Sequence, residues 1–459
     1  WETVLDLDAL AEAEGENWVW SEVECLGPDH RRCMIGLSRG GADATVVREF
    51  DTVAKEFVDG GFELSEAKHQ IDWKDEKTLW VASDFGEGSL TASGYARIAK
   101  SWERGTPLEE ATTVFEGSVD DVFVFGFSDH TPEGRSDFVS VIPEFFRGTS
   151  YIKLGERLVK LDIPEDAQMR GIFKERMLIS LRNDWQVGDT TYPQDALLAI
   201  GLDDFLRGGR AFDILFEPQE RVSLDQVGST RNYLIYTTLD NVHSRMYRLG
   251  PTEDGWSTEE LGLPGIGSVA LSQRGSAGSF FSNSSDNFFF TYTDFVTPTS
   301  LYLMDREGSS NRVKTSPAWF DATGMSVVQN EAVSKDGTKI PYFVFMPPGF
   351  EADGSNPTVI YAYGGFEVSR LPRYSAADGS GWVARGGVYV LANIRGGGEF
   401  GPKWHQAAMQ EKHQNNFDDL IAVDEDLVER KITSPKHLGI MGGSQGGLLV
   451  GGAFVQRPE

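Results

Sequence analysis

Residues 438–450 read LGIMGGSQGGLLV, and this stretch decides the fold of the C-terminal third of the chain. It is a short apolar run, a glycine-rich turn with one serine at its tip, and a run of small helix-forming residues. Gly442, Ser444 and Gly446 match G-x-S-x-G, the nucleophile elbow, in which a sharp strand-to-helix turn exposes the serine hydroxyl. Glycines suit such a turn because its backbone is strained and a Cβ would clash. We therefore expect a strand, a turn and a helix whose first N–H groups face the position where negative charge develops.

The alternative is a glycine-rich loop that matches the pattern by accident. The chain contains 51 glycines, so G-x-S-x-G alone is weak evidence. The apolar run before the turn, the helical run after it and the residues upstream favour the elbow.

Composition limits the class of protein. The chain has 459 residues, 40% of them hydrophobic, which is enough for two or three domains and a large core. No run of eighteen apolar residues indicates a transmembrane helix, and the first residues lack the basic and apolar pattern of a signal peptide. They also lack an initiator Met, so residue 1 need not be the natural start. The net charge of −28 disfavours binding to nucleic acid or anionic membranes. We expect a cytoplasmic location, with the periplasm left open.

The two cysteines, Cys25 and Cys33, are too few for a disulfide framework and do not form a metal-binding pattern. A disulfide across a hairpin is one interpretation, and two buried thiols is the favoured one. The sequence indicates no metal site and no cofactor.

Residues 1–325 consist of short β-type runs separated by turns rich in Asp, Gly, Ser and Asn. One unit recurs: an apolar strand, an Asp-containing turn and a second apolar strand. Clear pairs of strands are residues 78–84 with 95–98, 233–240 with 246–249, and 288–294 with 301–304; further first strands are residues 33–37, 122–125 and 177–181. The units are spaced by about 45 to 55 residues, which is the period of propeller blades.

We count about six such units and predict a β-propeller over residues 1–325, with an irregular β-sandwich as the alternative. One blade cannot bury both of its faces alone, so blades stack around an axis. Residues 197–206 read as a helical insertion between strands.

From residue 326 the pattern changes. Asp336-Gly337 between two alternating runs predicts a hairpin. Apolar strands follow at residues 358–363 and 388–393, then a helix at about residues 417–430 and the strand of the elbow. Alternating strands and helices predict an α/β domain with a mostly parallel sheet over residues 326–459.

Tyr363-Gly364-Gly365-Phe366 ends the first of these strands. An aromatic residue followed by two glycines at a strand end is where α/β-hydrolases place one side of the oxyanion hole. We predict that the Tyr363 hydroxyl and the Gln445 backbone N–H are its donors, each typically worth about 10²–10³ in rate. The alternative is a core tyrosine with a turn behind it.

Gly396, Gly398 and Gly401 match G-x-G-x-x-G after a strand, the pattern of a dinucleotide site. Such a site needs an acidic residue at the end of the next strand, about 20 residues further on. Asp418 and Asp419 lie at that distance but open a helix, so we favour a packed glycine-rich loop beside the active site.

Together, these motifs resemble the prolyl oligopeptidase family. They are YGGF at 363–366, ANIRGGGEFG at 392–401, WH at 404–405, NFDD at 416–419, TSPK at 433–436, GGSQGGLL at 442–449 and QRP at 456–458. The resemblance runs in order from about residue 327 to the end; before that it is one of architecture and spacing only. It implies a seven-bladed propeller joined to an α/β-hydrolase domain and a serine peptidase that cleaves short peptides after proline, folded proteins being excluded by the propeller.

The resemblance also implies site residues: Ser444 as the nucleophile, Tyr363 and the Gln445 N–H as the oxyanion hole, and Phe366 as a wall of the substrate pocket. Gln445 stands where the family frequently has Asn, a change that a backbone donor tolerates. We expect short peptides as partners, no nucleic acid, no membrane and, for the complete protein, a monomer.

One departure concerns the triad, whose order in this fold is Ser, Asp, His. The 15 residues after Ser444 contain no Asp and no His, and all seven histidines precede it. The resemblance places His405 and His413 near the sheet rather than at the position of the base. We therefore expect an internal fragment that lacks the acid, the base and the N-terminal segment of the family, and that is inactive alone.

Two further interpretations stay open. One is a non-catalytic β-propeller interaction module with a hydrolase remnant. The other is an aminopeptidase or esterase of the same fold, because the preference for proline rests on the resemblance alone.

Overall fold

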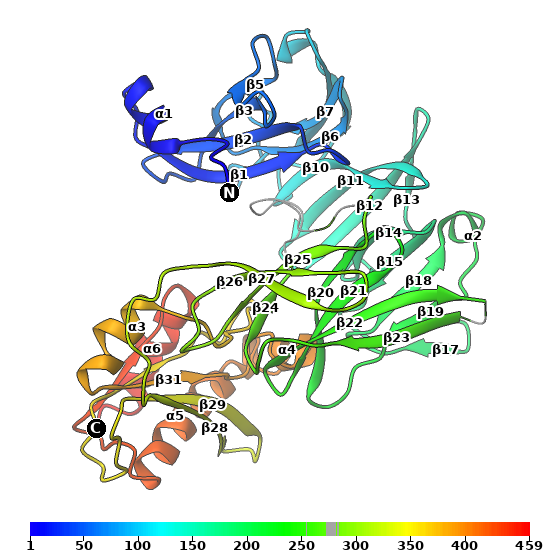
Figure 1. Cartoon of the computed structure of the whole chain (residues 1–459). Helices are drawn as coiled ribbons and strands as arrows, with labels where there is room; N and C mark the ends of the chain where they lie inside the picture. The colour runs from blue at the N-terminus through cyan, green and yellow to red at the C-terminus, as the bar shows by residue number, and fades with distance from the viewer. Residues whose placement is uncertain (254, 272–280, 282–283) are drawn as a thin grey trace.

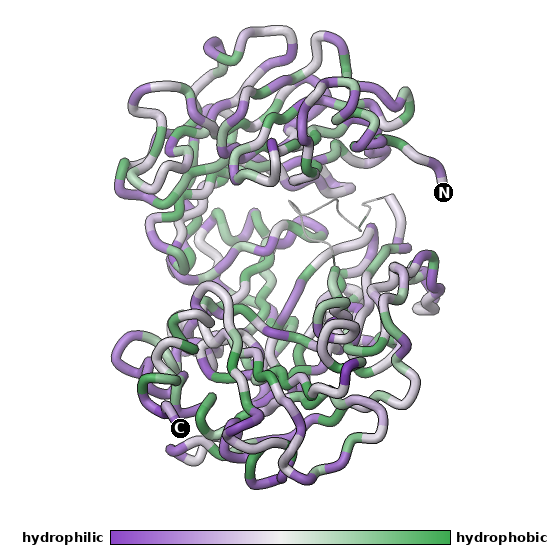
Figure 2. The backbone as a smooth tube through the Cα atoms, turned by 90° about the vertical axis from the view of Figure 1, so that its left-hand side faces the viewer, coloured by the Kyte–Doolittle hydropathy of each residue, from purple (hydrophilic) through white to green (hydrophobic). Residues whose placement is uncertain are grey.

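The computed structural model describes residues 1–253, 255–271, 281 and 284–459, and Figure 1 shows two parts. The strands up to β27 form a series of small antiparallel sheets, drawn from blue to yellow-green. The residues from β28 onward form one larger sheet with helices, drawn from yellow to red. Figure 2 shows that hydrophobic and hydrophilic residues alternate at short intervals along much of the chain, as expected for strands with one buried face.

Six antiparallel sheets follow one another along the first part. The first three are β1 (Trp18–Cys25), β2 (Arg32–Arg39), β3 (Thr45–Asp51), β4 (Glu56–Phe57) and β5 (Glu63–Ala67); β6 (Gln70–Asp75), β7 (Thr78–Ala82), β8 (Ile98–Glu103) and β9 (Thr112–Glu116); and β10 (Phe123–Thr131), β11 (Gly134–Glu144), β12 (Arg147–Leu154) and β13 (Arg157–Lys160).

The next three contain β14 (Gln168–Phe173), β15 (Arg176–Ser180), β18 (Leu197–Gly201) and β19 (Asp213–Phe216); β20 (Val222–Ser229), β21 (Leu234–Asp240), β22 (His243–Thr252) and β23 (Gly255–Leu261); and β24 (Ser268–Ala270), β25 (Phe288–Thr293), β26 (Ser300–Met304) and β27 (Ser310–Thr315). A hairpin of β16 (Trp185–Val187) and β17 (Thr190–Tyr192) is inserted in the fourth sheet.

These sheets are the blades of a β-propeller, and their number in the described residues is six. The six units counted in the sequence are thus found; the seventh blade that the family resemblance implies is not among the described residues. The core of this part lies between neighbouring blades. At Gly126 on β10, for example, an added Cβ would lie 2.2 Å from the indole ring of Trp80 in the preceding blade.

Two local expectations are wrong. Residues 197–206 are not one helix: residues 197–201 form β18, and only Leu202–Leu206 form α2. The four residues Leu197–Ile200 are all buried, because both faces of β18 are covered, and such a run lacks the alternation of a half-exposed strand. Cys25 and Cys33 are not free thiols but form a disulfide, since they lie directly opposite each other in the β1–β2 pair.

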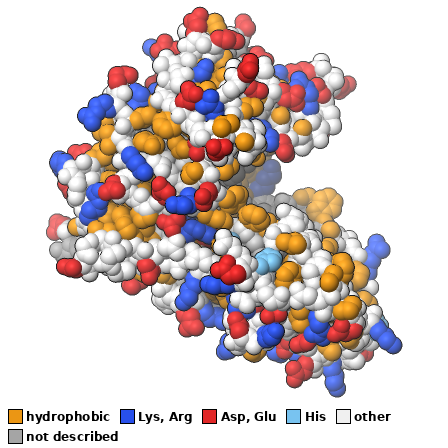
Figure 3. All heavy atoms as spheres, turned by 180° about the vertical axis from the view of Figure 1, so that it is seen from behind, with side chains coloured by type: hydrophobic (Ala, Val, Ile, Leu, Met, Phe, Trp, Pro, Cys, Tyr) orange, Lys and Arg blue, Asp and Glu red, His pale blue; other side chains and the backbone are white. Residues whose placement is uncertain are grey.

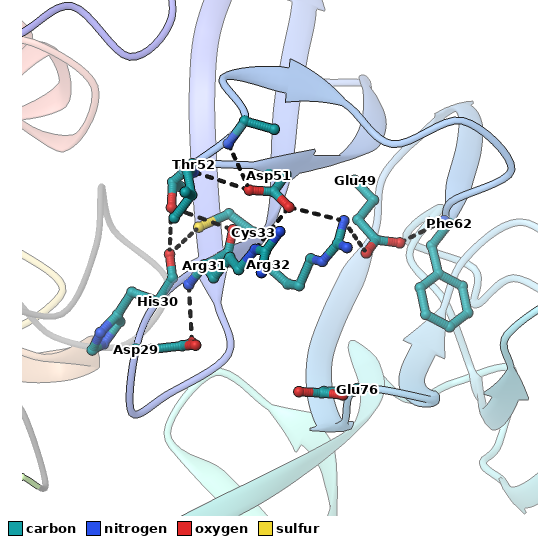
Figure 4. A network of polar contacts seen from close by, with 12 residues as sticks. Asp29, His30, Arg31, Arg32, Cys33, Glu49, Asp51, Thr52, Phe62 and Glu76 are labelled. Carbon is teal, nitrogen blue, oxygen red and sulfur yellow. Dashed lines mark hydrogen bonds and ion pairs between the residues drawn. The ribbon is translucent and has the colours of Figure 1, made fainter.

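A buried polar network joins the first two blades (Figure 4). Arg32 lies between the carboxylates of Asp51 and Glu49, at 3.5 and 3.8 Å. Glu49 is fully buried and accepts hydrogen bonds from the Phe62 N–H at 3.0 Å and from both terminal nitrogens of Arg104, which belongs to the second blade. Because Glu49 is paired and hydrogen-bonded, it links the two blades without leaving a buried charge unsatisfied.

The second part is built on a five-stranded sheet. Its strands are β28 (Ser326–Val333), β29 (Lys339–Met346), β30 (Thr358–Tyr361), β31 (Val388–Ala392) and β32 (Leu438–Met441), in the order β28-β29-β31-β30-β32. Three strands, β31, β30 and β32, are parallel, whereas β28 pairs antiparallel with β29, and β29 antiparallel with β31. The sheet is therefore mixed rather than mostly parallel, because the tight Asp336-Gly337 turn reverses the chain between β28 and β29.

Side chains alternate across this sheet and build two cores. On one face, residues such as Val344, Val390 and Ile360 pack with Leu420 and Leu449 from the helices. On the other face, residues of the same strands pack with Phe295 and Val242 from the propeller side. The sheet thus packs one face against its own helices and the other against the propeller.

The helices of this part are α3 (Ala376–Gly381), α4 (Gly401–Gln406), α5 (Gln414–Glu429) and α6 (Gln445–Gln456), and the 3-10 turns are η2 (Val383–Arg385) and η3 (Gln410–Lys412). The propeller part adds α1 (Leu7–Glu14) and η1 (Leu108–Glu110). Among the described residues, no helix has the length and apolar character needed to cross a bilayer. Figure 3 shows acidic and basic side chains interspersed on the face seen from behind, with hydrophobic patches between them.

Candidate active site

Ser444 lies at the turn between β32 and α6, as the motif predicts. β32 ends at Met441, α6 begins at Gln445, and Ser444 is the residue that caps the helix N-terminus. Its backbone has φ +54° and ψ −118°, a strained conformation for a residue with a Cβ. The residue is exposed. A strained serine held at a helix N-terminus is the arrangement of a nucleophile elbow.

Of the four glycines that flank Ser444 and Gln445, two are sterically required and two are not. An added Cβ at Gly442 would lie 2.4 Å from the carbonyl oxygen of Gly446, and one at Gly446 would lie 2.7 Å from the carbonyl oxygen of Ala362. Nothing lies within 4 Å of the corresponding position at Gly443, and the nearest atom at Gly447 is 4.0 Å away. Gly442 is thus constrained by the elbow's own backbone and Gly446 by the end of β30, so both glycines of G-x-S-x-G have a steric reason, which argues against an accidental match of the pattern.

The turn that carries Tyr363 lies directly against the elbow. The Ala362 N–H donates to the carbonyl oxygen of Met441 at 3.2 Å, which continues the pairing of β30 with β32. Tyr363 is buried, and an added Cβ at Gly365 would lie 2.3 Å from Cγ of Gln445. The structure therefore brings the Tyr363 turn to the N-terminus of α6, at the carboxyl ends of two parallel strands.

The glycine-rich loop 396–401 packs behind this turn. Gly396 has φ +94°, and an added Cβ there would lie 2.2 Å from the carbonyl oxygen of Gly364. Asn416, fully buried on α5, donates to the carbonyl oxygens of Gly364 at 2.8 Å and of Arg395 at 2.7 Å. Close backbone packing against its neighbours supports the packed-loop interpretation of these glycines over a phosphate cradle.

Below the loop, Arg395 holds a buried ionic cluster. Its guanidinium contacts the fully buried Asp419 of α5 at 2.5 Å and Asp336 of the β28–β29 hairpin at 2.5 Å, and Ser334 donates to Asp419 at 2.6 Å. The hydrogen bond from Arg395 lowers the pKa of Asp336 to about 2. The cluster fixes α5, the hairpin and the glycine-rich loop to one another, and so supports the turn that carries Tyr363.

In the sequence, the only signal that Asn416 and Asp419 support the fold is their position on helix α5. Both lie on the apolar face of α5, where a polar side chain needs a buried partner. That pattern could have identified them as scaffold residues.

Phe366 lies where the two parts of the chain meet. It has φ +53°, 46% of it is exposed, and its ring makes an edge-to-face contact with Phe145 of the propeller at a centroid distance of 5.3 Å. Phe145 and Phe146 form the tip of the β11–β12 hairpin. Sequence reasoning missed Phe145, although two phenylalanines at an exposed hairpin tip are a signal for a contact surface.

Beside this contact, a polar cluster connects the two parts. Arg182 of the propeller forms an ion pair with Glu367 and donates to Nδ1 of His405 at 2.7 Å. Burial and the neighbouring Arg182 lower the pKa of His405 to about 4. Because Nδ1 of His405 already accepts this hydrogen bond, His405 connects the two parts of the chain and has a structural role. His413 lies elsewhere, packed against Phe417, with Nδ1 donating to the Ala408 carbonyl at 3.2 Å.

The elbow forms one edge of the sheet. Within the described residues β32 pairs only with β30, and Met441 is exposed at its end. Helix α6 exposes the apolar side chains of Leu448, Phe454 and Val455. In the described residues, this edge of the sheet and this face of α6 thus expose apolar side chains.

The sequence matches two family models. One is described as "Prolyl oligopeptidase, N-terminal beta-propeller domain" and matches residues 1–317, and the other as "Prolyl oligopeptidase family" and matches residues 374–459. An uncharacterized peptidase of Sinorhizobium fredii is 38% identical over the whole chain, which spans 64% of that relative. A prolyl endopeptidase of Elizabethkingia miricola is 32% identical over 54% of the chain and 33% of its own length.

Among solved structures, a post-proline cleaving enzyme from Rickettsia typhi superimposes on the whole chain with a TM-score of 0.92 and 32% identity, the chain covering 68% of it. The chain thus spans about two thirds of the proteins that it matches from end to end. The propeller match over more than half of the chain, the relatives and the shared fold agree with the motifs, and the chain belongs to the prolyl oligopeptidase family.

Proposed function

We propose that this chain is part of a serine-type oligopeptidase that hydrolyses short peptides after proline through an acyl-enzyme on Ser444. The observation that carries the proposal is the strained, exposed Ser444 at the N-terminus of α6, whose next residues, Gln445 and Gly446, pack against the turn that bears Tyr363. In this proposal the Ser444 hydroxyl attacks the substrate carbonyl. The Tyr363 hydroxyl and the Gln445 N–H donate to the oxyanion as it forms.

A serine hydroxyl needs a base to accept its proton. The histidine nearest in sequence to the elbow, His437, precedes β32, whereas Ser444 follows it, and its Nδ1 forms a hydrogen bond with the Ser434 hydroxyl at 2.9 Å. Of the next two, His405 accepts a hydrogen bond from Arg182 and His413 donates to a backbone carbonyl. We therefore propose that the triad's His and Asp lie outside these 459 residues, in a longer protein. The chain alone then has negligible peptidase turnover.

Phe366 and Phe145 support the substrate side of the proposal. Their contact places an aromatic surface between the propeller and the hydrolase part, residues 1–325 and 326–459, and an aromatic wall suits a proline ring. Cleavage after proline is also what the printed name of the Rickettsia typhi structure states for that enzyme. We extend the same substrate class to this protein, acting as a monomer on peptides short enough to pass the propeller.

The test compares the longer protein with the 459-residue chain on three chromogenic substrates. These are an amino-blocked peptide ending in proline, a free amino-terminal amino acid anilide and a simple ester. The proposal expects turnover of the blocked proline peptide by the longer protein only. Preference for the free amino terminus or the ester would indicate the aminopeptidase or esterase alternative, absence of all turnover would indicate a non-catalytic module, and robust turnover by the chain alone would refute the missing base.

A further inference from the structure

We propose that Arg370 is a positioning residue for the oxyanion hole, acting through the ring of Tyr363. The inference rests on the proposed function and deepens it: the guanidinium over the phenol strengthens the hydroxyl as a donor to the developing oxyanion. Arg370 lies seven residues after Tyr363 and belongs to no motif identified in the sequence.

The guanidinium is stacked on the strand that leads into the site. Its central carbon lies 4.2 Å from the centre of the Tyr363 ring and 5.6 Å from that of Tyr361. These tyrosines are two positions apart, so their side chains leave the strand on the same side. Tyr363 is buried, and a cation over a desolvated aromatic face interacts more strongly than one at an exposed site.

The backbone of Arg370 is held on both sides. Its N–H donates to Oε1 of Glu399 at 2.8 Å, and its carbonyl oxygen accepts from Nδ2 of Asn393 at 2.6 Å. Asn393 and Glu399 are both buried, and they come from the end of β31 and from the glycine-rich loop. Since both backbone groups are engaged, the position from which the guanidinium reaches Tyr363 is fixed.

The guanidinium of Arg370 lies over the tyrosine rings, and its charge also acts on the buried Glu399, whose pKa burial raises to about 7 and Arg370 partly lowers. Within the described residues the buried Nε of Arg370 has no hydrogen-bond partner. A cation over the ring withdraws electron density from the hydroxyl and adds positive potential beside it. Both effects grow as the oxyanion acquires charge, so they stabilise the transition state more than the bound substrate.

The test uses the longer protein and the hydrolysis of the blocked proline peptide. Arg370→Met keeps an unbranched side chain and removes the charge, Arg370→Lys keeps a cation, and Arg373→Met is the matched control because Arg373 is exposed nearby. We expect Arg370→Met to lower kcat by about tenfold with KM unchanged, since a desolvated cation–ring contact is worth about that factor. Arg370→Lys should recover part of the loss, and Arg373→Met should have no effect.

Two results separate this role from a structural one. In a Tyr363→Phe background, Arg370→Met should no longer lower kcat, because the hydroxyl through which it acts is gone. The same tenfold loss in that background, or a rise in KM in place of the fall in kcat, would overturn the inference while leaving the peptidase intact.

A second readout does not require hydrolysis. With 3-fluorotyrosine placed at position 363 of the longer protein, the ¹⁹F resonance should shift on Arg370→Met and stay in place on Arg373→Met. An unshifted resonance would overturn the inference. A shifted resonance in a protein without turnover would instead count against the proposed function alone.

Discussion

The glycines of the elbow allow a test in which two neighbouring substitutions change stability in opposite directions. Gly446 and Gly447 both lie in the first turn of α6. An alanine at position 446 would place its Cβ 2.7 Å from the carbonyl oxygen of Ala362, whereas at position 447 the nearest atom is 4.0 Å away. The chemical change is the same in both, so any difference comes from the contact between the elbow and β30.

The magnitudes follow from two opposing terms. Replacing glycine by alanine in a helix gains up to about 1 kcal/mol from helix propensity. Forcing a methyl group into a close-packed contact costs about 1–3 kcal/mol, and here the obstacle is backbone, which cannot rotate away. We therefore expect Gly447→Ala to stabilise α6 by up to about 1 kcal/mol. Gly446→Ala should destabilise it by about 1 kcal/mol after the propensity gain is subtracted.

Hydrogen exchange of the α6 amides measures this locally, because each amide reports the free energy of opening its own segment. Exchange in α6 should become several-fold faster in Gly446→Ala and several-fold slower in Gly447→Ala. In the longer protein, Gly446→Ala should also lower peptidase activity, up to about 10²-fold if Ser444 is displaced by about 1 Å. Equal effects of the two substitutions, or protection of α6 by Gly446→Ala, would refute the reasoning.

Three further predictions concern the scaffold. Arg395→Met should lower the free energy of unfolding by about 3–5 kcal/mol, because it leaves the fully buried Asp419 without a cation. Arg306→Met, which removes an exposed ion pair, should change the free energy of unfolding by less than about 1 kcal/mol. Urea unfolding compares the two variants, and equal losses would contradict the account. Burial raises the pKa of Asp424 to about 7, so its ionisation favours the unfolded chain increasingly as pH rises from about 4 towards 7. Asp424→Asn, neutral at every pH, should therefore stabilise the chain more at pH 8 than at pH 5.5, and a pH-independent effect would show that the carboxyl does not titrate as described. In limited proteolysis, residues 326–459, with the exposed edge of β32 and the apolar face of α6, should be cleaved before the propeller; earlier loss of the propeller would contradict this expectation.

The elements with a strong local pattern could be predicted from the sequence. The strand, turn and helix around Ser444, the hairpin at Asp336-Gly337 and the repeated strand units of the propeller all have a composition and periodicity typical of the structures that they form. The helix predicted at about residues 417–430 is α5, which begins three residues earlier. The misread segment 197–206 shows the limit, because a strand buried on both faces has no alternation.

Contacts between distant segments could not be predicted in this way. The sequence shows six glycines close to or within the elbow and the Tyr363 turn, but only the packing reveals that Gly446 is constrained and Gly447 is not. Phe145 reaches Phe366 from 221 residues away in the sequence, and Arg182 reaches His405 from 223. No periodicity encodes such pairs, because they depend on how the propeller and the hydrolase sheet are placed against each other.

The central claim, that Ser444 is the nucleophile, is tested most directly by mapping a covalent adduct. The longer protein is treated with a fluorophosphonate, digested, and analysed by mass spectrometry, with Ser444→Ala as the control. The account predicts one stoichiometric adduct on the peptide that contains Ser444, complete loss of post-proline hydrolysis in the labelled protein, and neither labelling nor turnover in Ser444→Ala. An adduct on another residue, or a Ser444→Ala protein that still cleaves the peptide, would contradict it.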